Sequence, residues 1–380
     1  MKRLSKRTAV TALLLAGLTI SGLFVFTETP AWANGMTGHG YVQQNLVSND
    51  TTKIPANHQD TTLLNAWGVA FFPGGPFWIN DNGAGISALY QGDGTGFAGA
   101  DPALAVTVPT PKGGTPPSAP TGIVANTSFV FNLKSDSTPA LFIFDTEDGT
   151  ISAWNLALGV PATAELEVDN SAETCANGAT GAVYKGLALG ANATGVFLYA
   201  TNFRCATIDV FDGTFKPATL SGKFQDSQIP AGFAPFGINN VLANLVVTYA
   251  KQNGQKHDDV AGKGNGFVDV FDTNGNLIQR LVRQGHLNSP WGIALAPSNF
   301  GQLSGNLLIG NFGDGRIDAY DLISGHFTDA VEDPHGQVIK IDGLWSLIFG
   351  GAAASNPGTL YFTAGPNGET DGLFGEISPQ

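Results

Sequence analysis

The sequence has few charged residues, two cysteines and one long apolar run, and each scarcity excludes a class of protein. Charged residues make up 13% of the 380 positions, and 31 acidic residues stand against 18 basic ones. A chain so poor in lysine and arginine lacks the basic surface that attracts phosphate backbones and anionic lipid headgroups. We therefore expect neither nucleic acid nor membrane surfaces as partners.

The one long apolar run lies near the N-terminus, between Ala9 and Phe26. Four basic residues precede it and the tripeptide Ala31-Trp32-Ala33 follows it, which is the pattern of a secretory signal peptide. An uncleaved N-terminal anchor is the alternative interpretation. No later stretch has the roughly 20 apolar residues that a membrane-spanning helix needs. The sequence thus predicts a signal peptide at residues 1–33 and an exported protein in the periplasm, at the cell surface or outside the cell, with no transmembrane segment after cleavage.

The remaining chain is strongly acidic. Removal of residues 1–33 would take away four basic residues and Glu28, leaving 14 basic and 30 acidic residues and a formal net charge of −16. Such a surface attracts divalent cations, although acidity in exported proteins most often serves solubility. The 50 glycines follow no three-residue period, so they indicate many tight turns rather than a collagen helix.

The two cysteines are Cys175 and Cys205. In an oxidising compartment an even pair favours a disulfide, which would close a loop of about 30 residues and stabilise the fold by roughly 3 kcal/mol in the chain-entropy model. Two cysteines without nearby histidines make a poor zinc site. We therefore expect a Cys175–Cys205 disulfide.

A unit recurs six times along the rest of the chain. Each copy opens with a three-residue entry whose second residue is small and whose third is aliphatic. It later contains a strand in which apolar and polar residues alternate. The entries are Trp67-Gly68-Val69, Thr121-Gly122-Ile123, Lys185-Gly186-Leu187, Phe236-Gly237-Ile238 and Trp291-Gly292-Ile293, with Trp345-Ser346-Leu347 as a degenerate sixth. The exit strands are Ile86-Ser87-Ala88-Leu89, Ile151-Ser152-Ala153-Trp154, Ile208-Asp209-Val210-Phe211, Val268-Asp269-Val270-Phe271 and Ile317-Asp318-Ala319-Tyr320, with Leu373 to Ile377 in the last unit.

Successive entry glycines lie 54, 64, 51 and 55 residues apart. Repeats of this length, built from short strands and glycine-rich turns, are typical of propeller blades. A propeller must close its ring, because an open last blade would expose sheet edges. The stretch from Tyr41 to Val47 reads as a strand without a hairpin partner, so we expect it to join the blade that ends at Ile377. The prediction is an all-β, six-bladed β-propeller over residues 34–380, closed by an N-terminal strand that joins the C-terminal blade.

Three longer connections depart from the unit, at residues 107–120, 169–184 and 251–266. The first is rich in proline, the second contains Cys175, and the third separates the second and third strands of the fourth unit. Functional residues lie in loops more often than in scaffold strands, so these loops are candidate functional segments.

One candidate metal site comes from the repeat itself. Counting back six residues from the start of an exit strand selects Asn80, Asp145, Asn202 and Asn311. Equivalent positions of a propeller point toward one axis, so these side chains would form a polar ring in the channel, and converging oxygen ligands suit Ca²⁺ or Mg²⁺. The alternative is that these residues end their strands because Asn and Asp cap turns.

A second candidate lies in the loop at residues 251–266, where His257, Asp258 and Asp259 place an imidazole beside two carboxylates. Adjacent side chains of an extended chain point apart, so at most two of the three would reach one ion. The cluster is a candidate metal or acid–base site. A solvated loop whose aspartates cap its own turns is the alternative.

Aromatic residues stand at four of the six entries, Trp67, Phe236, Trp291 and Trp345. They are candidates for a sugar-binding or other ligand platform at one mouth of the channel. We favour a core role instead, because large aromatic side chains dominate burial.

Two resemblances concern the fold. Residues 287–321 read Leu-Asn-x-Pro-x-Gly-Ile-Ala, then an aliphatic strand, then Gly-Arg-Ile-Asp-x-Tyr-Asp, and so resemble an NHL-type repeat. Together with the signal peptide and the Lys256–Gly262 insertion, the chain also resembles a family of exported bacterial proteins of unassigned function. These resemblances imply a six-bladed propeller and no particular reaction.

A third resemblance concerns chemistry. NHL-like propellers are similar to the gluconolactonase-like enzymes, which hold a divalent metal in the channel with carboxylate and Asn ligands. Asn80, Asp145, Asn202 and Asn311 would supply oxygens here, but no Glu stands at the blade entries. The set therefore offers one carboxylate and no evident general base.

The sequence thus predicts an exported propeller that acts as a binding or scaffolding module for an unidentified protein or carbohydrate ligand. The alternative prediction is a divalent-metal-dependent hydrolase or lyase of lactonase type that uses the central channel.

Overall fold

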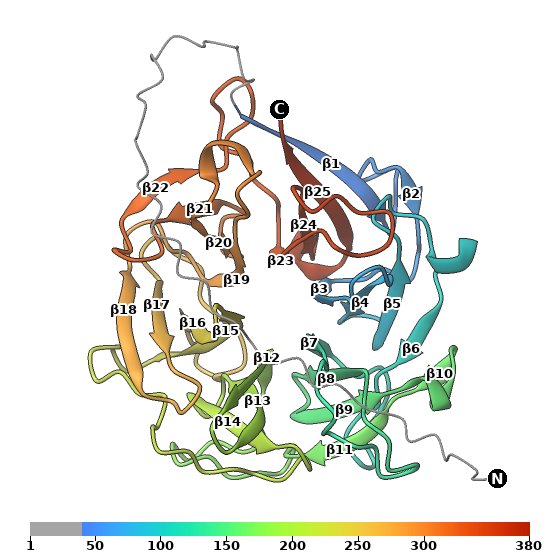
Figure 1. Cartoon of the computed structure of the whole chain (residues 1–380), viewed down its shortest axis with the longest axis vertical. Helices are drawn as coiled ribbons and strands as arrows, with labels where there is room; N and C mark the ends of the chain where they lie inside the picture. The colour runs from blue at the N-terminus through green and yellow to red at the C-terminus, as the bar shows by residue number, and fades with distance from the viewer. Residues whose placement is uncertain (1–39) are drawn as a thin grey trace, which may run out of the picture. The chain divides into compact units, whose positions relative to one another are not determined.

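The computed structural model of the protein describes residues 40–380, so the predicted signal peptide lies outside the described residues. Six sheets are arranged around a central channel (Figure 1). This arrangement confirms the predicted all-β, six-bladed propeller. No helix among residues 40–380 is long and apolar enough to cross a membrane.

Each sheet forms one blade, with its innermost strand at the channel. Blade 1 contains β3 (Ala66–Ala70), β4 (Phe77–Asp81), β5 (Ile86–Tyr90), β6 (Ala105–Thr107) and β10 (Ala162–Thr163). Blade 2 contains β7 (Pro120–Ala125), β8 (Phe142–Thr146), β9 (Thr150–Trp154) and β11 (Glu165–Asp169). Blade 3 contains β12 (Tyr184–Asn192), β13 (Gly195–Asn202) and β14 (Thr207–Asp212).

The other three blades follow the same plan. Blade 4 contains β15 (Phe233–Val241), β16 (Asn244–Lys251), β17 (Gly266–Phe271) and β18 (Leu277–Arg283). Blade 5 contains β19 (Pro290–Leu295), β20 (Leu307–Asn311), β21 (Ile317–Tyr320) and β22 (Phe327–Ala330). Blade 6 contains β23 (Leu344–Phe349), β24 (Leu360–Ala364), β25 (Leu373–Pro379), β1 (Tyr41–Ser48) and β2 (His58–Gln59). The helical segments are short: η1 (Phe97–Gly99), η2 (Leu156–Leu158), η3 (Gly301–Leu303) and α1 (Pro366–Glu369).

The ring is closed by strands from the two ends of the described chain. Strand β1 pairs with β25 in antiparallel register, from Tyr41 opposite Pro379 to Ser48 opposite Leu373. The predicted closure is therefore confirmed. Because β1 and β25 pair with each other, the backbone groups along their shared edge are hydrogen-bonded.

Apolar clusters fill the spaces between neighbouring blades. Six clusters each combine side chains of two adjacent blades, as where Leu187 of blade 3 packs with Ile143 of blade 2. The aliphatic third residue of each entry belongs to one of these clusters: Val69, Ile123, Leu187, Ile238, Ile293 and Leu347. Burying one such side chain stabilises the fold by roughly 1.5–3 kcal/mol. The aliphatic residue of the repeat is therefore an interblade core residue.

The entry glycine is required by the close approach of the next blade. A Cβ atom on Gly237 would lie 2.1 Å from the carbonyl oxygen of Trp291, and one on Gly68 would lie 2.3 Å from that of Thr121. In each case the obstructing carbonyl belongs to the innermost strand of the following blade. The glycine, present in five of the six units, thus sets how closely neighbouring innermost strands approach one another around the channel.

Two further sequence predictions can be compared with the fold. Cys175 and Cys205 form a disulfide, as predicted. The alignment of the first exit strand was one residue out, because the strand register places Ala88, and not Ser87, level with Asp209 of blade 3. Ile86 precedes the repeated pattern, whose aromatic position in blade 1 is Tyr90.

Candidate functional site

The entry aromatics meet on the propeller axis and close the channel. The ring centroids of Trp67 and Trp345 are 3.6 Å apart, those of Trp67 and Trp291 6.1 Å, and those of Phe236 and Trp345 5.9 Å. The last two contacts join blades that are not neighbours in the ring, so they cross the axis. All four side chains are at most 8% exposed. The core interpretation is confirmed, although the rings pack on the axis and not between blades.

The indoles of this axial cluster are fixed by hydrogen bonds. Trp67 Nε1 and Trp345 Nε1 both donate to Asn65 Oδ1, each at 2.9 Å. Trp291 Nε1 donates to the carbonyl of Lys185 at 2.7 Å. Buried indole N–H groups normally need such partners. The cluster therefore forms a rigid floor.

Lys185 extends over this floor from the start of β12. Its side chain is 3% exposed, and Nζ lies 5.0 Å from the Trp67 ring centroid. The ammonium forms an ion pair with Glu147, from the turn between β8 and β9, and lies 3.8 Å from Asp258 Oδ1. A buried ammonium needs such charged partners together with an aromatic face.

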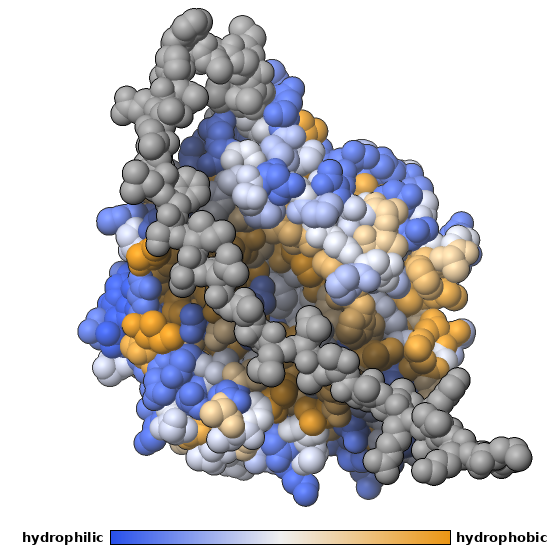
Figure 2. Space-filling model, in the orientation of Figure 1, coloured by the Kyte–Doolittle hydropathy of each residue, from blue (hydrophilic) through white to orange (hydrophobic). Residues whose placement is uncertain are grey.

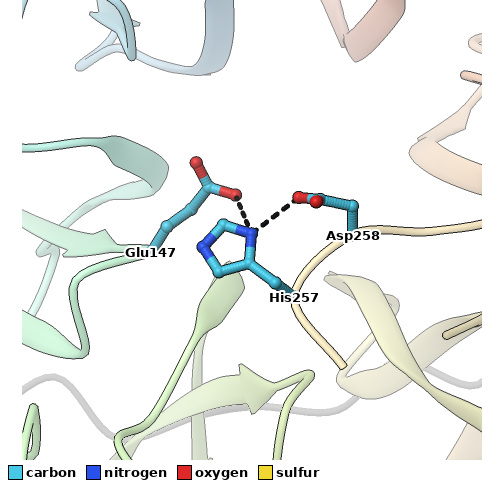
Figure 3. A group of neighbouring side chains, drawn as sticks. All are labelled: Glu147, His257 and Asp258. Carbon is cyan, nitrogen blue, oxygen red and sulfur yellow. Dashed lines mark hydrogen bonds and ion pairs between the residues drawn. The ribbon is translucent and has the colours of Figure 1, made fainter. Parts of the chain in front are cut away.

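The loop at residues 251–266 brings His257 and Asp258 to the same place. His257 Nδ1 lies 2.6 Å from Asp258 Oδ1 and 3.9 Å from Glu147 Oε1 (Figure 3). The loop is held by hydrogen bonds within it and to blade 3: the backbone N–H of Asn253 donates to the carbonyl of Asp258, and Gln252 Nε2 donates to the carbonyl of Phe203, after β13. The imidazole is 36% exposed, so a ligand can reach it.

Two more carboxylates complete the set. Burial raises the pKa of Glu369, and the nearby Glu147 adds to the rise. Burial also raises the pKa of Asp259, against the opposing effect of Lys185. The hydrogen bond from His257 lowers the pKa of Asp258. We call the set Glu147, Lys185, His257, Asp258, Asp259 and Glu369 the acidic mouth.

Asparagines link the carboxylates around the acidic mouth. Asn65 Nδ2 donates to Glu369 Oε2 at 2.7 Å and to Asn82 Oδ1 at 3.3 Å, while Asn82 Nδ2 donates to Glu147 Oε2 at 3.0 Å. The network therefore runs from blade 6 through blade 1 to blade 2. Because Asn65 also accepts the indole N–H groups, the floor and the acidic rim are one hydrogen-bonded structure.

The four residues of the predicted channel ring occupy two different registers. Tyr184 pairs with Asn202 and Pro290 with Asn311, so these two asparagines are equivalent. In blades 1 and 2 the corresponding residues are Asp81 and Thr146. Asn80 and Asp145 therefore lie one residue earlier along their strands. Counting back six residues from each exit strand therefore selects residues that are not equivalent in the strand register.

The hydrogen bonds of these four side chains go to nearby backbone and side-chain groups. Asn80 Nδ2 donates to the carbonyls of Thr121 and Gly122 in the next blade. Asp145 Oδ1 accepts from Thr121 Oγ1 and the Gly122 N–H. Other backbone N–H groups donate to Asn202 Oδ1, from Val183 and Cys205, and to Asn311 Oδ1, from Asn288. These contacts are of the turn-capping and strand-linking kind, and metal binding by the ring stays a prediction.

The second candidate set is partly assembled. One oxygen or nitrogen atom each from Glu147, His257 and Asp258 lie within 4.8 Å of one another, a grouping that could hold a metal ion. A nitrogen and two carboxylate oxygens suit a divalent cation, but the Lys185 ammonium already contacts the same carboxylates and would compete with it. The donor set therefore fits a cation in its chemistry, provided that Lys185 moves or shares the carboxylates.

Comparison with known proteins identifies relatives. No family model matches the chain. The uncharacterized protein R648 of Acanthamoeba polyphaga mimivirus is 30% identical over 348 residues, which cover 87% of this chain and 78% of that protein. The chain belongs to the family of this mimivirus protein. Uncharacterized protein L690 of the same virus, 29% identical over 348 residues, covers 87% of this chain and 84% of its own length.

Solved structures share the fold with this member of the mimivirus protein family. A glucose dehydrogenase aligns with a TM-score of 0.51 at 12% identity, over 89% of this chain and all of that chain. A streptogramin B lyase aligns with a TM-score of 0.44 at 12% identity, over 90% of this chain and 97% of that chain. At 12% identity the likeness to the glucose dehydrogenase shows the propeller fold and carries no chemistry.

Sequence reasoning missed Glu147, Lys185 and Glu369. Lys185 did carry a signal, because it stands at an entry position where four of the six units of this family member have an aromatic residue. A lysine at a position that buries aromatics must find carboxylates. Glu147 and Glu369 lie in turns, and no local pattern distinguishes them from other acidic turn residues.

Proposed function

We propose that the protein is a ligand-binding propeller whose site is the acidic mouth, and that its ligand carries positive charge. The supporting observation is the imbalance of charge around Lys185. Four carboxylates from blades 2, 4 and 6 or their connections surround one buried ammonium and one histidine. A cation would relieve the repulsion that contributes to the raised pKa of Glu369.

The cation would be a divalent metal ion or the amine of an organic ligand. Carboxylate and amide oxygens suit Ca²⁺ or Mg²⁺, and His257 also suits a transition metal. The aromatic floor beneath Lys185 would accept a ligand ammonium in the same way that it accepts the lysine. In either case Glu147 and Asp258 would be the main anchors.

Calorimetric titration of the purified protein with Ca²⁺, Mg²⁺, Zn²⁺ and a primary diamine tests this proposal. We expect one of these cations to bind, and the variant Glu147→Gln to bind it at least tenfold more weakly. Glu332→Gln is the matched control, because it removes one carboxylate outside the acidic mouth. The proposal fails if none of the cations binds or if the two variants behave alike.

A second candidate function is that of a cation-dependent hydrolase or lyase acting at the same place. The observation in its favour is the His257–Asp258 pair, in which the carboxylate would orient an exposed imidazole as a general base. With lactones and esters as trial substrates, His257→Gln should lose at least 100-fold in turnover while still binding the cation. Exposed His326 provides the control substitution, His326→Gln. Absence of turnover in the unaltered protein would leave binding as the function.

Export completes the proposal. The signal peptide predicted at residues 1–33 and the Cys175–Cys205 disulfide support an oxidising compartment outside the cytoplasm. Mass spectrometry of the protein recovered from cell fractions should find a mature N-terminus at Asn34. Recovery from the cytoplasm with Met1 or Lys2 still present would contradict export.

A further inference from the structure

A cavity lies at the end of the channel opposite the acidic mouth, and we propose that it binds a small, neutral, mainly apolar molecule with one hydrogen-bonding group. The cavity has a volume of about 300 Å³ and is lined by all six innermost strands. Figure 2 shows one face of the molecule, on which apolar residues surround a central hollow. The site is separate from the acidic mouth and does not depend on the proposed function.

The direction of the innermost strands places the two sites at opposite ends. Lys185 lies at the start of β12 and faces the acidic mouth, whereas Leu189 lines the cavity four residues later. Four residues of strand span about 13 Å. The axial aromatic cluster lies between the sites, and Trp291 belongs both to that cluster and to the cavity lining. A molecule in the cavity would therefore rest against an indole and would not reach Lys185.

The lining decides the class of ligand. It contains no charged residue, although the chain carries 31 acidic residues. Partly exposed apolar side chains form the outer wall: Phe71, Val124, Ala125, Leu189 and Ile348. A charged ligand would lose its hydration here without gaining a charged partner, which costs several kcal/mol. The cavity is also at the lower end of the size range of small-molecule pockets.

Polar side chains in the lining are few: Asn239 and Asn240 of blade 4 and Ser346 of blade 6. The amides of Asn239 and Asn240 are fixed in position, because each Nδ2 donates to a carbonyl of a neighbouring blade, from Ile293 and Leu189 respectively. Ser346 occupies the position that is glycine in the other five units, so blade 6 alone places a hydroxyl there. Within residues 40–380 this hydroxyl has no hydrogen-bond partner, which leaves it available to a ligand.

Two fluorescent probes that share a ring system test the proposal. N-phenyl-1-naphthylamine is neutral, whereas 1-anilinonaphthalene-8-sulfonate carries the same rings with a sulfonate. We expect the neutral probe to bind the purified protein with a fluorescence increase, and to bind at least tenfold more tightly than the sulfonate. Equal binding of the two probes would overturn the proposal, because the cavity would then not select against charge.

Substitutions locate the binding. Leu189→Asp places a charge in the cavity and should weaken binding of the neutral probe at least tenfold, while Leu156→Asp, at a 75% exposed leucine outside the cavity, should leave it unchanged. If Leu189→Asp does not fold, Ala125→Trp fills the outer part of the cavity and should weaken binding equally. Glu332→Gln, outside both sites, should have no effect on the probe. Equal losses in Leu189→Asp and Leu156→Asp would contradict the assignment.

Discussion

The ammonium of Lys185, from blade 3, lies 5.0 Å from the centroid of the Trp67 ring, from blade 1. Blade 2 separates these blades in the ring, so the contact crosses the channel. Glu147, from blade 2, forms an ion pair with the same ammonium. One side chain thus connects three blades at the end of the channel where the innermost strands begin.

Replacement of Lys185 by methionine should therefore destabilise the whole propeller. Removing one partner of a buried ion pair leaves the other charge uncompensated, at a cost of about 3 kcal/mol. Urea unfolding should show this loss for Lys185→Met and a partial recovery for the double variant Lys185→Met, Glu147→Gln. Lys216→Met, at an exposed lysine, should change the free energy of unfolding by less than about 0.5 kcal/mol. A similar small change in Lys185→Met would mean that the contact is not structural.

Asp145 should make stability depend on pH. Burial raises its pKa from 3.8 to about 7, although hydrogen bonds from Thr121 and Gly122 oppose the rise. The folded protein therefore holds a proton that the unfolded chain releases near pH 4, so Asp145 lowers the free energy of unfolding as pH rises from 4 to 7. Above pH 7 the loss is complete and amounts to at most about 4 kcal/mol.

The variant Asp145→Asn should remove this dependence, because the amide keeps an oxygen acceptor and carries no charge. The free energy of unfolding of Asp145→Asn minus that of the unaltered protein should be larger at pH 8 than at pH 5. Asp136→Asn is the control, because it makes the same substitution at an aspartate whose pKa is lowered by local hydrogen bonds. Identical differences at the two pH values would contradict a raised pKa at Asp145.

The entry glycines should tolerate no side chain. In Gly237→Ala the new Cβ would meet the Trp291 carbonyl at 2.1 Å, so two innermost strands would have to separate. We expect a loss of about 2 kcal/mol or more in thermal or urea unfolding. Gly254→Ala is the matched control, because nothing lies within 4 Å of a Cβ there. Equal stabilities would show that the strands can move apart at little cost.

Closure by β1 should be essential to the fold. Val47 is fully buried opposite Phe374, whereas Val42 on the same strand is 46% exposed. Val47→Asp would bury a carboxylate and should lower the free energy of unfolding by more than about 3 kcal/mol, while Val42→Asp should cost less than about 1 kcal/mol. If the two variants unfold at the same urea concentration, strand β1 is not needed for closure.

The repeat and its closure could be predicted from the sequence because they are local patterns. The glycine entries, the alternating exit strands and the strand without a hairpin partner at Tyr41–Val47 each follow from a few neighbouring residues. The register between strands was less accessible. The first exit strand was aligned one residue early, which misplaced Asn80. The turn between the second and third strands of blade 2 is one residue shorter than in blades 3 and 5, which misplaced Asp145 relative to Asn202 and Asn311.

The acidic mouth could be predicted only in part. His257 and Asp258 are adjacent in the sequence and stood out as a cluster. Their partners Glu147 and Glu369 come from distant turns, and only the closed ring brings them near Lys185. Sites assembled across an axis depend on the whole fold, so no single unit of the repeat contains their pattern.

The pairing of β1 with β25 also sets the order of folding. These strands are separated by almost the whole length of the described chain, so blade 6 cannot form until the last residues have been synthesised. Contacts of such long sequence separation form slowly, because the chain must first close a very large loop. The ring of blades therefore stays open until strand β25 has been made and has paired with β1.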